Sequence, residues 1–232
     1  MAPRRIGPKL FAVGLAAVLM MVGISGHTSL ALALTEAETK RAEALIPLLD
    51  GGQSFWAIGE FVHLGPPAIP ILVQALSHPS RRVRINAIEA MYLIKDKSAI
   101  QSLNALAANP KEIPAVREKA LRVAIRLDPT SAMPALEMMA HDGEEAIRHT
   151  VITESRAVKD KAVIDLLIAL LADDIPSIAD GAAQALYGFT GRLVERQDFL
   201  QSTPAQRRAW SEDWAHWWDE HRDSFNFAAH RP

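Results

Sequence analysis

VRINAIEAMYLIKDKSAIQSL, residues 83–103, is the stretch that decides the fold. Its first part carries apolar residues at Val83, Ala87, Met91 and Ile94, the i, i+4, i+8, i+11 spacing that forms one stripe of an α-helix. A short polar break follows, and residues 99–103 open a second apolar segment. The stretch therefore predicts a helix, a short loop and another helix.

The same pattern recurs along the chain. Val83-Arg84 is followed by Val116-Arg117, Ile147-Arg148 and Ile178-Ala179, in steps of 33, 31 and 31 residues. Helix-breaking residues separate the segments: His78-Pro79-Ser80, Asn109-Pro110, Asp128-Pro129, Asp142-Gly143 and Asp173-Asp174. A fixed period of this length is typical of an α-solenoid. Residues 34–190 are therefore predicted to form an all-α, α-α superhelix of stacked antiparallel helix pairs.

These motifs resemble the HEAT repeat in its bacterial, phycobilin-lyase-like form. A Val-Arg pair opens one helix, and Ser98-Ala99-Ile100-Gln101-Ser102-Leu103 or Ser131-Ala132-Met133-Pro134-Ala135-Leu136 opens the next. The resemblance covers about residues 44–190 and implies the fold, while saying almost nothing about function. The chain departs from the family in its glycines, because the glycine that often ends the second helix is present only as Gly65 and Gly188.

Composition excludes several classes of protein. Hydrophobic residues make up 49% of the chain and charged residues 22%, which suits a globular core rather than disorder. The formal net charge of −2 lacks the basic excess that nucleic-acid binding requires, so no nucleic-acid partner is predicted. The chain has no cysteine, which excludes disulfides, thiolate metal sites and thiol nucleophiles.

The N-terminus has the form of a secretory signal peptide. Arg4, Arg5 and Lys9 precede an apolar run over residues 10–24, and Ala31-Leu32-Ala33 supplies the small-x-small pattern of a cleavage site. We predict a signal peptide over residues 1–33 and export to the periplasm or beyond, with membrane contact only in transit. An uncleaved N-terminal anchor is the alternative. Cleavage removes three basic residues and no acidic ones, which leaves a net charge of −5.

Arg84, Arg117 and Arg148 occupy the same place in three successive repeats. One interpretation is a basic stripe for an anionic ligand. We favour the other, a structural ladder in which each arginine binds carboxylates or carbonyls in the loop of a neighbouring repeat. The planar guanidinium suits this role because it donates several hydrogen bonds from one side chain.

Glu154 is the least expected residue of the repeats. The residues at the equivalent positions are apolar: Ala90, Val123 and Ala185. A carboxylate in that layer is costly to bury unless it is paired. Glu154 therefore either faces a polar pocket with His149 and Ser155, or marks a local change of register.

Each interpretation of Glu154 names its own contacts. In the pocket, Arg122 or Arg156 would be the partner of Glu154. In the register change, the core would be filled instead by three apolar neighbours, Ile152, Ala157 and Val158.

Other catalytic and metal motifs are missing from the sequence. It contains no G-x-S-x-G, P-loop, dinucleotide or H-E-x-x-H pattern. Glu145 and His149 are four residues apart and can meet on one helical face, but two side chains fall short of the three or four protein ligands of zinc. We therefore predict a protein that is not an enzyme and has no metal or cofactor.

Residues 191–232 are predicted to form a connector and an amphipathic capping helix. Thr203-Pro204-Ala205-Gln206 is a capping box, and four tryptophans follow on one stripe: Trp210, Trp214, Trp217 and Trp218. The helix either covers the apolar end of the solenoid, which we favour, or offers an aromatic surface to a partner, or lies on a membrane. Trp218 is expected to be the most exposed of the four.

Two classes of function remain. The favoured one is a scaffold that binds a protein or peptide partner on a concave face lined by the second helices of the repeats. The residues expected to contact the partner are Arg81, Arg82, Asn86, Glu89, Lys119, Arg122, Thr153 and Trp218. The alternative, which the family resemblance implies, is an enzyme or small-ligand protein that handles a tetrapyrrole through the polar pocket near Glu154.

Overall fold

The computed structural model describes residues 33–192 and 198–228. All but the last residue of the expected signal peptide lies outside these ranges. The described residues form eleven α-helices and several short 3-10 helices, with no strand among them. The α-helices are α1 (Glu36–Leu45), α2 (Ser54–Leu64), α3 (Ile69–Ala75), α4 (Arg81–Ile94), α5 (Ile100–Ala108), α6 (Pro114–Leu127), α7 (Met133–Ala140), α8 (Glu145–Ser155), α9 (Lys161–Leu170), α10 (Pro176–Thr190) and α11 (Pro204–His221).

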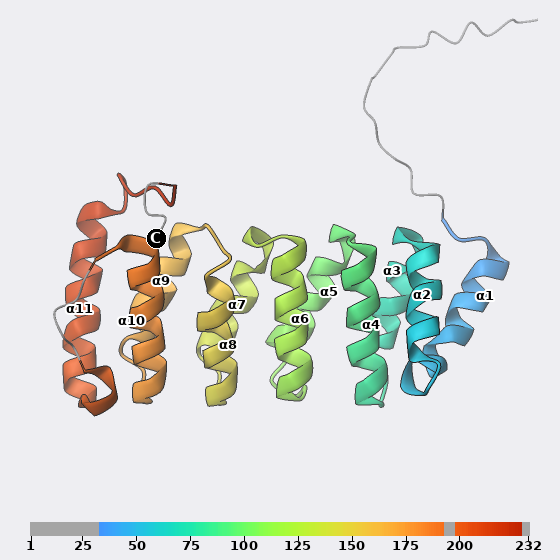
Figure 1. Ribbon diagram of the computed structural model, residues 1–232, viewed down its shortest axis with the longest axis horizontal. Helices are drawn as coiled ribbons and strands as arrows, with labels where there is room; N and C mark the ends of the chain where they lie inside the picture. Colours follow the sequence, from blue (N-terminus) through green and yellow to red (C-terminus); the bar gives the residue numbers. More distant parts are fainter. Residues whose placement is uncertain (1–32, 193–197, 229–232) are drawn as a thin grey trace, which may run out of the picture. The chain divides into compact units, whose positions relative to one another are not determined.

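The helices of the repeats stand in two layers (Figure 1). The second helices of the pairs, α2, α4, α6, α8 and α10, lie in the nearer row and contact one another in sequence. The first helices, α3, α5, α7 and α9, form the row behind them. We call these rows the second-helix layer and the first-helix layer. The arrangement confirms the all-α solenoid of stacked helix pairs.

The core lies between the two layers and is built from the predicted stripe. Val83, Ala87 and Met91 of α4 are completely buried, and so are Val116 and Ala120 at the equivalent positions of α6. The alanines in these stripes have no bulk beyond Cβ, so neighbouring helices approach closely. Because every repeat contributes the same stripe, the buried residues join into one continuous core.

The ends of the helices follow the sequence signals with one exception. Thr203 forms the predicted capping box at the start of α11, and Thr35 forms another at the start of α1. Gly65 ends α2 with a φ of 70°. The expectation for Gly188 is wrong, because it lies inside α10 and the helix ends instead at Gly191, whose φ is 67°. A positive φ favours glycine, since a Cβ atom is strained in that conformation.

The C-terminal helix α11 covers the last repeat by packing against α9. Trp214 and Trp218 have 0% and 1% of their surface exposed. The Nε1–H group of Trp218 donates to Asp165 at 2.8 Å, and the hydroxyl of Ser211 donates to the carbonyl of Ile168 at 2.8 Å. The tryptophan cluster therefore closes the core, as the cap interpretation expected.

The expectation that Trp218 is exposed is wrong. The face of α11 that meets α9 is centred on Arg207, Trp214 and Trp218, all of them buried. Trp217 lies on the flank of this face, where it remains partly exposed and stacks on His221 with ring centres 4.5 Å apart. Trp218 is therefore a core residue and is not available as a partner contact.

No single helix among the described residues is long and apolar enough to cross a bilayer, although the bent pair formed by residues 54–64 and 66–75 meets the criteria of length and composition.

Candidate functional site

Three arginines, one in each of α4, α6 and α8, connect their helix to the loop of the next repeat. Their carboxylate partners lie 25 to 28 residues further along the chain, as the pairs Arg84–Glu112, Arg117–Asp142 and Arg148–Asp173. Each arginine also donates to at least one backbone carbonyl, such as that of His78 for Arg84 at 2.7 Å. The structure thus shows a ladder of ion pairs, in which the three guanidinium groups bind carboxylates and carbonyls of the repeats themselves.

A fourth arginine plays a similar role and was missed by the sequence analysis. Arg207 of α11 is 1% exposed and donates to the carbonyls of Asp173, Asp174 and Ser202 at 2.8, 2.9 and 2.7 Å. The signal for it was in the sequence, because each ladder arginine stands four residues after its N-cap. The N-caps are Ser80, Ile113, Glu144 and Thr203.

Asp142 contacts two of the ladder arginines, Arg117 through its carboxylate and Arg148 through its backbone carbonyl. Burial by itself raises the pKa of this carboxyl group, but hydrogen bonds from the Arg117 side chain and the Glu144 backbone amide, with the charge of Arg148, outweigh it. The pKa of Asp142 is therefore held below its ordinary value of 3.8. The carboxylate is charged at neutral pH and holds two neighbouring repeats together.

Glu154 is paired with Arg122, one of its two expected partners. The Nε group of Arg122 in α6 donates to Glu154 in α8 at 2.7 Å, and the Glu154 side chain is 15% exposed. The core around it is filled by Ile152 and Val158, which are buried, whereas Ala157 is exposed. The carboxylate in this apolar layer is thus stabilised by an ion pair between neighbouring repeats.

The three residues of the expected polar pocket do not converge. His149 is 46% exposed and lies 3.6 Å from Glu145 on its own helix. Ser155 is fully buried and donates to the carbonyl of Ile152 at 2.8 Å. Neither these two nor Glu154 lines one of the two cavities described below. Each of the three residues instead has a partner of its own: Glu145 for His149, Arg122 for Glu154 and the Ile152 carbonyl for Ser155.

Several of the expected partner-binding residues connect a second helix to a neighbouring element instead. Lys119 donates to Glu89 at 2.6 Å, and the Asn86 amide donates to the carbonyl of Leu49 at 2.7 Å. Arg122 is held by Glu154. Three expected residues form no hydrogen bond or ion pair between repeats in the described structure: Arg81, Arg82 and Thr153, whose hydroxyl donates to a carbonyl of its own helix.

The second-helix layer carries most of the large exposed hydrophobic side chains. Of eight such residues in the described structure, five lie on second helices: Phe55, Trp56, Val62, Leu93 and Tyr187. Phe55 is 88% exposed and Trp56 52%, which is unusual for residues of this size. The first-helix layer carries only Met138, at 61%. The sequence analysis did not single out any of these residues.

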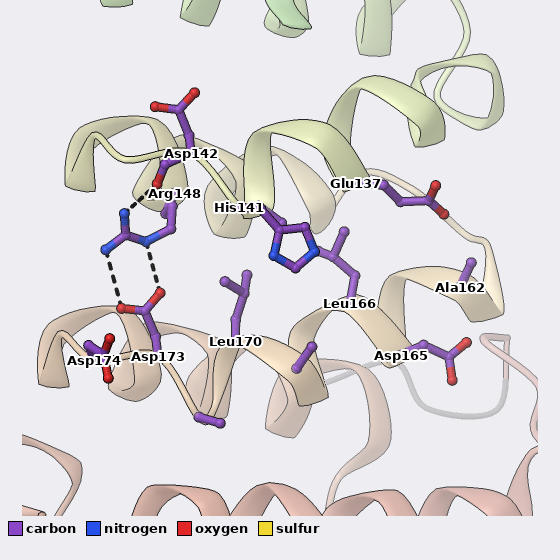
Figure 2. A pocket seen from close by; sticks show the side chains of 13 residues that line it. Glu137, His141, Asp142, Arg148, Ala162, Asp165, Leu166, Leu170, Asp173 and Asp174 are labelled. Atoms are coloured by element: carbon purple, nitrogen blue, oxygen red, sulfur yellow. Dashed lines mark hydrogen bonds and ion pairs between the residues drawn. The ribbon is translucent and has the colours of Figure 1, made fainter. Parts of the chain in front are cut away.

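The larger of the two cavities is an open groove of about 550 Å³ between α7 and α9 (Figure 2). Leu166 and Leu170 line its middle, below His141. The Arg148–Asp173 pair lies at one end, while Glu137 and Asp165 lie at the other. Five carboxylates and one guanidinium line the groove, so its electrostatics favour cations over anions: Glu137, Asp142, Asp165, Asp173 and Asp174, with Arg148.

Three of these five carboxylates are already engaged by cations or donors. Asp142 and Asp173 accept from ladder arginines, and Asp165 accepts from Trp218 and Arg222. Within residues 33–192 and 198–228, no group of three histidine, aspartate or glutamate side chains is placed to hold a metal ion. Most charged groups of the groove thus belong to the arginine ladder or to the contacts made by the C-terminal cap. They mainly stabilise the repeats.

Comparison with known families agrees with this architecture. The family model for HEAT repeats matches residues 53–113 and 111–187, which together span more than half of the chain. The protein therefore belongs to the HEAT-repeat family. No curated protein matches it in a sequence search.

One solved structure that is similar is a chain of the complex of CpcE and CpcF of phycocyanin lyase from Nostoc sp. PCC7120. The two sequences are 21% identical, and the TM-score is 0.49. The match covers 63% of this chain and 98% of that chain.

Proposed function

We propose that the protein is an exported HEAT-repeat scaffold that binds a protein or peptide partner on its second-helix layer. The observation that supports this most strongly is the exposure of Phe55, Trp56 and Leu93, at 88%, 52% and 43%. Exposed aromatic side chains of this kind are enriched in the centres of protein interfaces. Exposing them to water costs free energy that a partner would recover by covering them.

The regular spacing of the layer also supports partner binding. Ion pairs such as Lys119–Glu89 and Arg122–Glu154 connect successive second helices, so their outer surfaces are held in register. A rigid surface loses little conformational entropy when it binds. Export is supported by the signal-peptide pattern of residues 1–33.

The small-ligand alternative near Glu154 required side chains that converge on a shared space. Because His149 and Glu154 have separate partners and line neither cavity, we do not propose it.

The proposal is tested by affinity capture with residues 34–232, the chain that remains after the predicted cleavage. The immobilised chain is exposed to envelope extract of its own organism, and retained proteins are identified by mass spectrometry. The test variant combines Phe55→Ser and Trp56→Ser. The control is Met138→Ser, which removes a similarly exposed apolar side chain from the first-helix layer.

The proposal expects a retained protein that the control also retains and the test variant loses. Both variants must keep the helical circular dichroism spectrum of the wild type, because replacing exposed side chains should not change the fold. Equal retention by the test variant and the control, or loss by both, would contradict binding through the second-helix layer.

A further inference from the structure

The smaller cavity, of about 300 Å³, lies between the loop that follows α8 and the C-terminal half of α10. Six residues line it: Arg156, Lys159, Gln184, Ala185, Gly188 and Phe189. Its volume is at the lower end of the range of roughly 300–1,000 Å³ for ligand sites, so it suits a side chain rather than a large cofactor. Four of its lining residues belong to α10, a helix of the second-helix layer.

The cavity is lined by two cations and no acidic residue. Among the described residues, Arg156 and Lys159 form no ion pair with a carboxylate, whereas the ladder arginines and Arg122 all do. The Lys159 ammonium lies 5.0 Å from the centre of the Phe189 ring and 5.7 Å from that of Phe227. These rings hold the lysine side chain in place without neutralising its charge.

The carboxylates that are near these residues in the sequence have other hydrogen-bond partners. Glu154 is held by Arg122 at 2.7 Å, and Asp160 caps α9 by accepting from the Ala162 amide at 2.9 Å. Asp180 accepts from the Gln184 side chain at 2.8 Å. Among the described residues, no carboxylate forms an ion pair with either cation of the cavity, whereas the acidic groove between α7 and α9 contains the Arg148–Asp173 pair.

We propose that this cavity receives an acidic side chain, aspartate or glutamate, from a peptide segment of the partner. The planar guanidinium of Arg156 matches a carboxylate with two parallel hydrogen bonds, and Lys159 adds a second charge. The apolar wall formed by Phe189 and Ala185 suits the methylene groups of the same side chain. This inference rests on the proposed function, which supplies the partner that carries the carboxylate.

Gly188 provides a way to close the cavity without changing its charge. A Cβ atom added at Gly188 would meet no atom within 4 Å, so a larger side chain at this position extends into open space. Gly188→Leu should therefore obstruct the cavity while leaving Arg156 and Lys159 in place.

The test is a titration of ¹⁵N-labelled residues 34–232 with three short peptides, followed by NMR. The first is acetyl-Gly-Glu-Glu-Gly-amide, whose only charges are acidic side chains. The second replaces both glutamates by glutamine and has no charge. The third is the glutamine peptide with a free terminal carboxylate.

We expect the first peptide alone to shift the amide signals of residues that line the cavity. Arg156→Gln combined with Lys159→Gln should weaken binding about tenfold or more, because it removes both charges that hold the carboxylate. The control variant, Lys111→Gln with Arg208→Gln, removes the same charge from exposed positions elsewhere and should bind as the wild type does. Gly188→Leu should weaken binding as well, and it replaces the double variant as the test variant if the double variant loses helicity.

Equal binding by the double variant and its control would overturn the proposal. So would shifts that scatter over the surface, or binding of the third peptide but not the first. The titration uses no natural partner, so its failure would leave the affinity capture through Phe55 and Trp56 unaffected, and the two proposals fail independently.

Discussion

Arg148 donates two hydrogen bonds to Asp173, from Nε at 2.8 Å and from Nη2 at 3.2 Å, and so connects α8 to the loop before α10. Both side chains are nearly buried, at 11% and 10% exposure. The pair is one rung of a ladder that fixes the spacing of the repeats, and it leaves the outer surface of the second helices free for binding.

Replacing Arg148 by alanine should lower the free energy of unfolding by about 3 kcal/mol, because it leaves the carboxylate of Asp173 buried without its partner. Arg41→Ala, which breaks an ion pair whose arginine is 65% exposed, should cost less than about 1 kcal/mol. Urea unfolding followed by circular dichroism measures both. Similar costs for the two variants would show that the ladder does not hold the repeats together.

Asp142 should make stability depend on pH in the acidic range. Its pKa is lower in the folded chain than the ordinary value of 3.8, so the unfolded chain binds a proton more readily. The stabilisation is therefore fully present above that value and is lost as pH falls through the lower, folded pKa. Unfolding of the wild type and of Asp142→Asn should differ most near neutral pH and converge in strong acid. A difference that grows as the pH falls would contradict the sign of the shift.

The tryptophans of α11 should differ in their importance for stability. Trp218→Ala removes a buried ring and a hydrogen bond to Asp165, and should cost about 3–5 kcal/mol. Trp217→Ala should cost clearly less, because this ring is partly exposed on the flank of the helix. Thermal unfolding curves rank the two variants. The reverse order would mean that Trp217 rather than Trp218 closes the core.

Gly188 and Gly191 should respond to alanine in opposite directions. Gly188 lies inside α10 with open space around it, so alanine should stabilise the helix by up to about 1 kcal/mol. Gly191 has a φ of 67°, so alanine there should destabilise by about 1 kcal/mol or more. The comparison uses the midpoint of urea unfolding. A stabilising Gly191→Ala variant would be inconsistent with the left-handed end of α10.

The repeated pattern predicted the fold because it depends on local spacing alone. The stripe through Val83, Ala87 and Met91 and its copies fix both the helices and the faces they bury. The centre of a buried face is harder to predict when it contains a polar residue. On α11 the buried Arg207 shifts that centre towards Trp218, and a count of apolar residues alone misses the shift.

Contacts between repeats could be predicted only in part. The partner of Glu154 is Arg122, 32 residues earlier, and a repeat of 31 to 33 residues brings such positions close together. That spacing made Arg122 a candidate but could not choose between it and Arg156. The exposure of Phe55 was not predictable, because it depends on which side chains a neighbouring helix places over it. The equivalent residue of α4, Ile85, is partly covered.

Photo-crosslinking in intact cells tests whether a partner covers the second-helix layer. A photoreactive phenylalanine analogue is placed separately at Phe55, at Leu93 and, on the first-helix layer, at Met138. If a partner covers this layer, Phe55 and Leu93 should crosslink to the same protein and Met138 should not. Crosslinks from Met138 alone, or equal crosslinks from both layers, would contradict it.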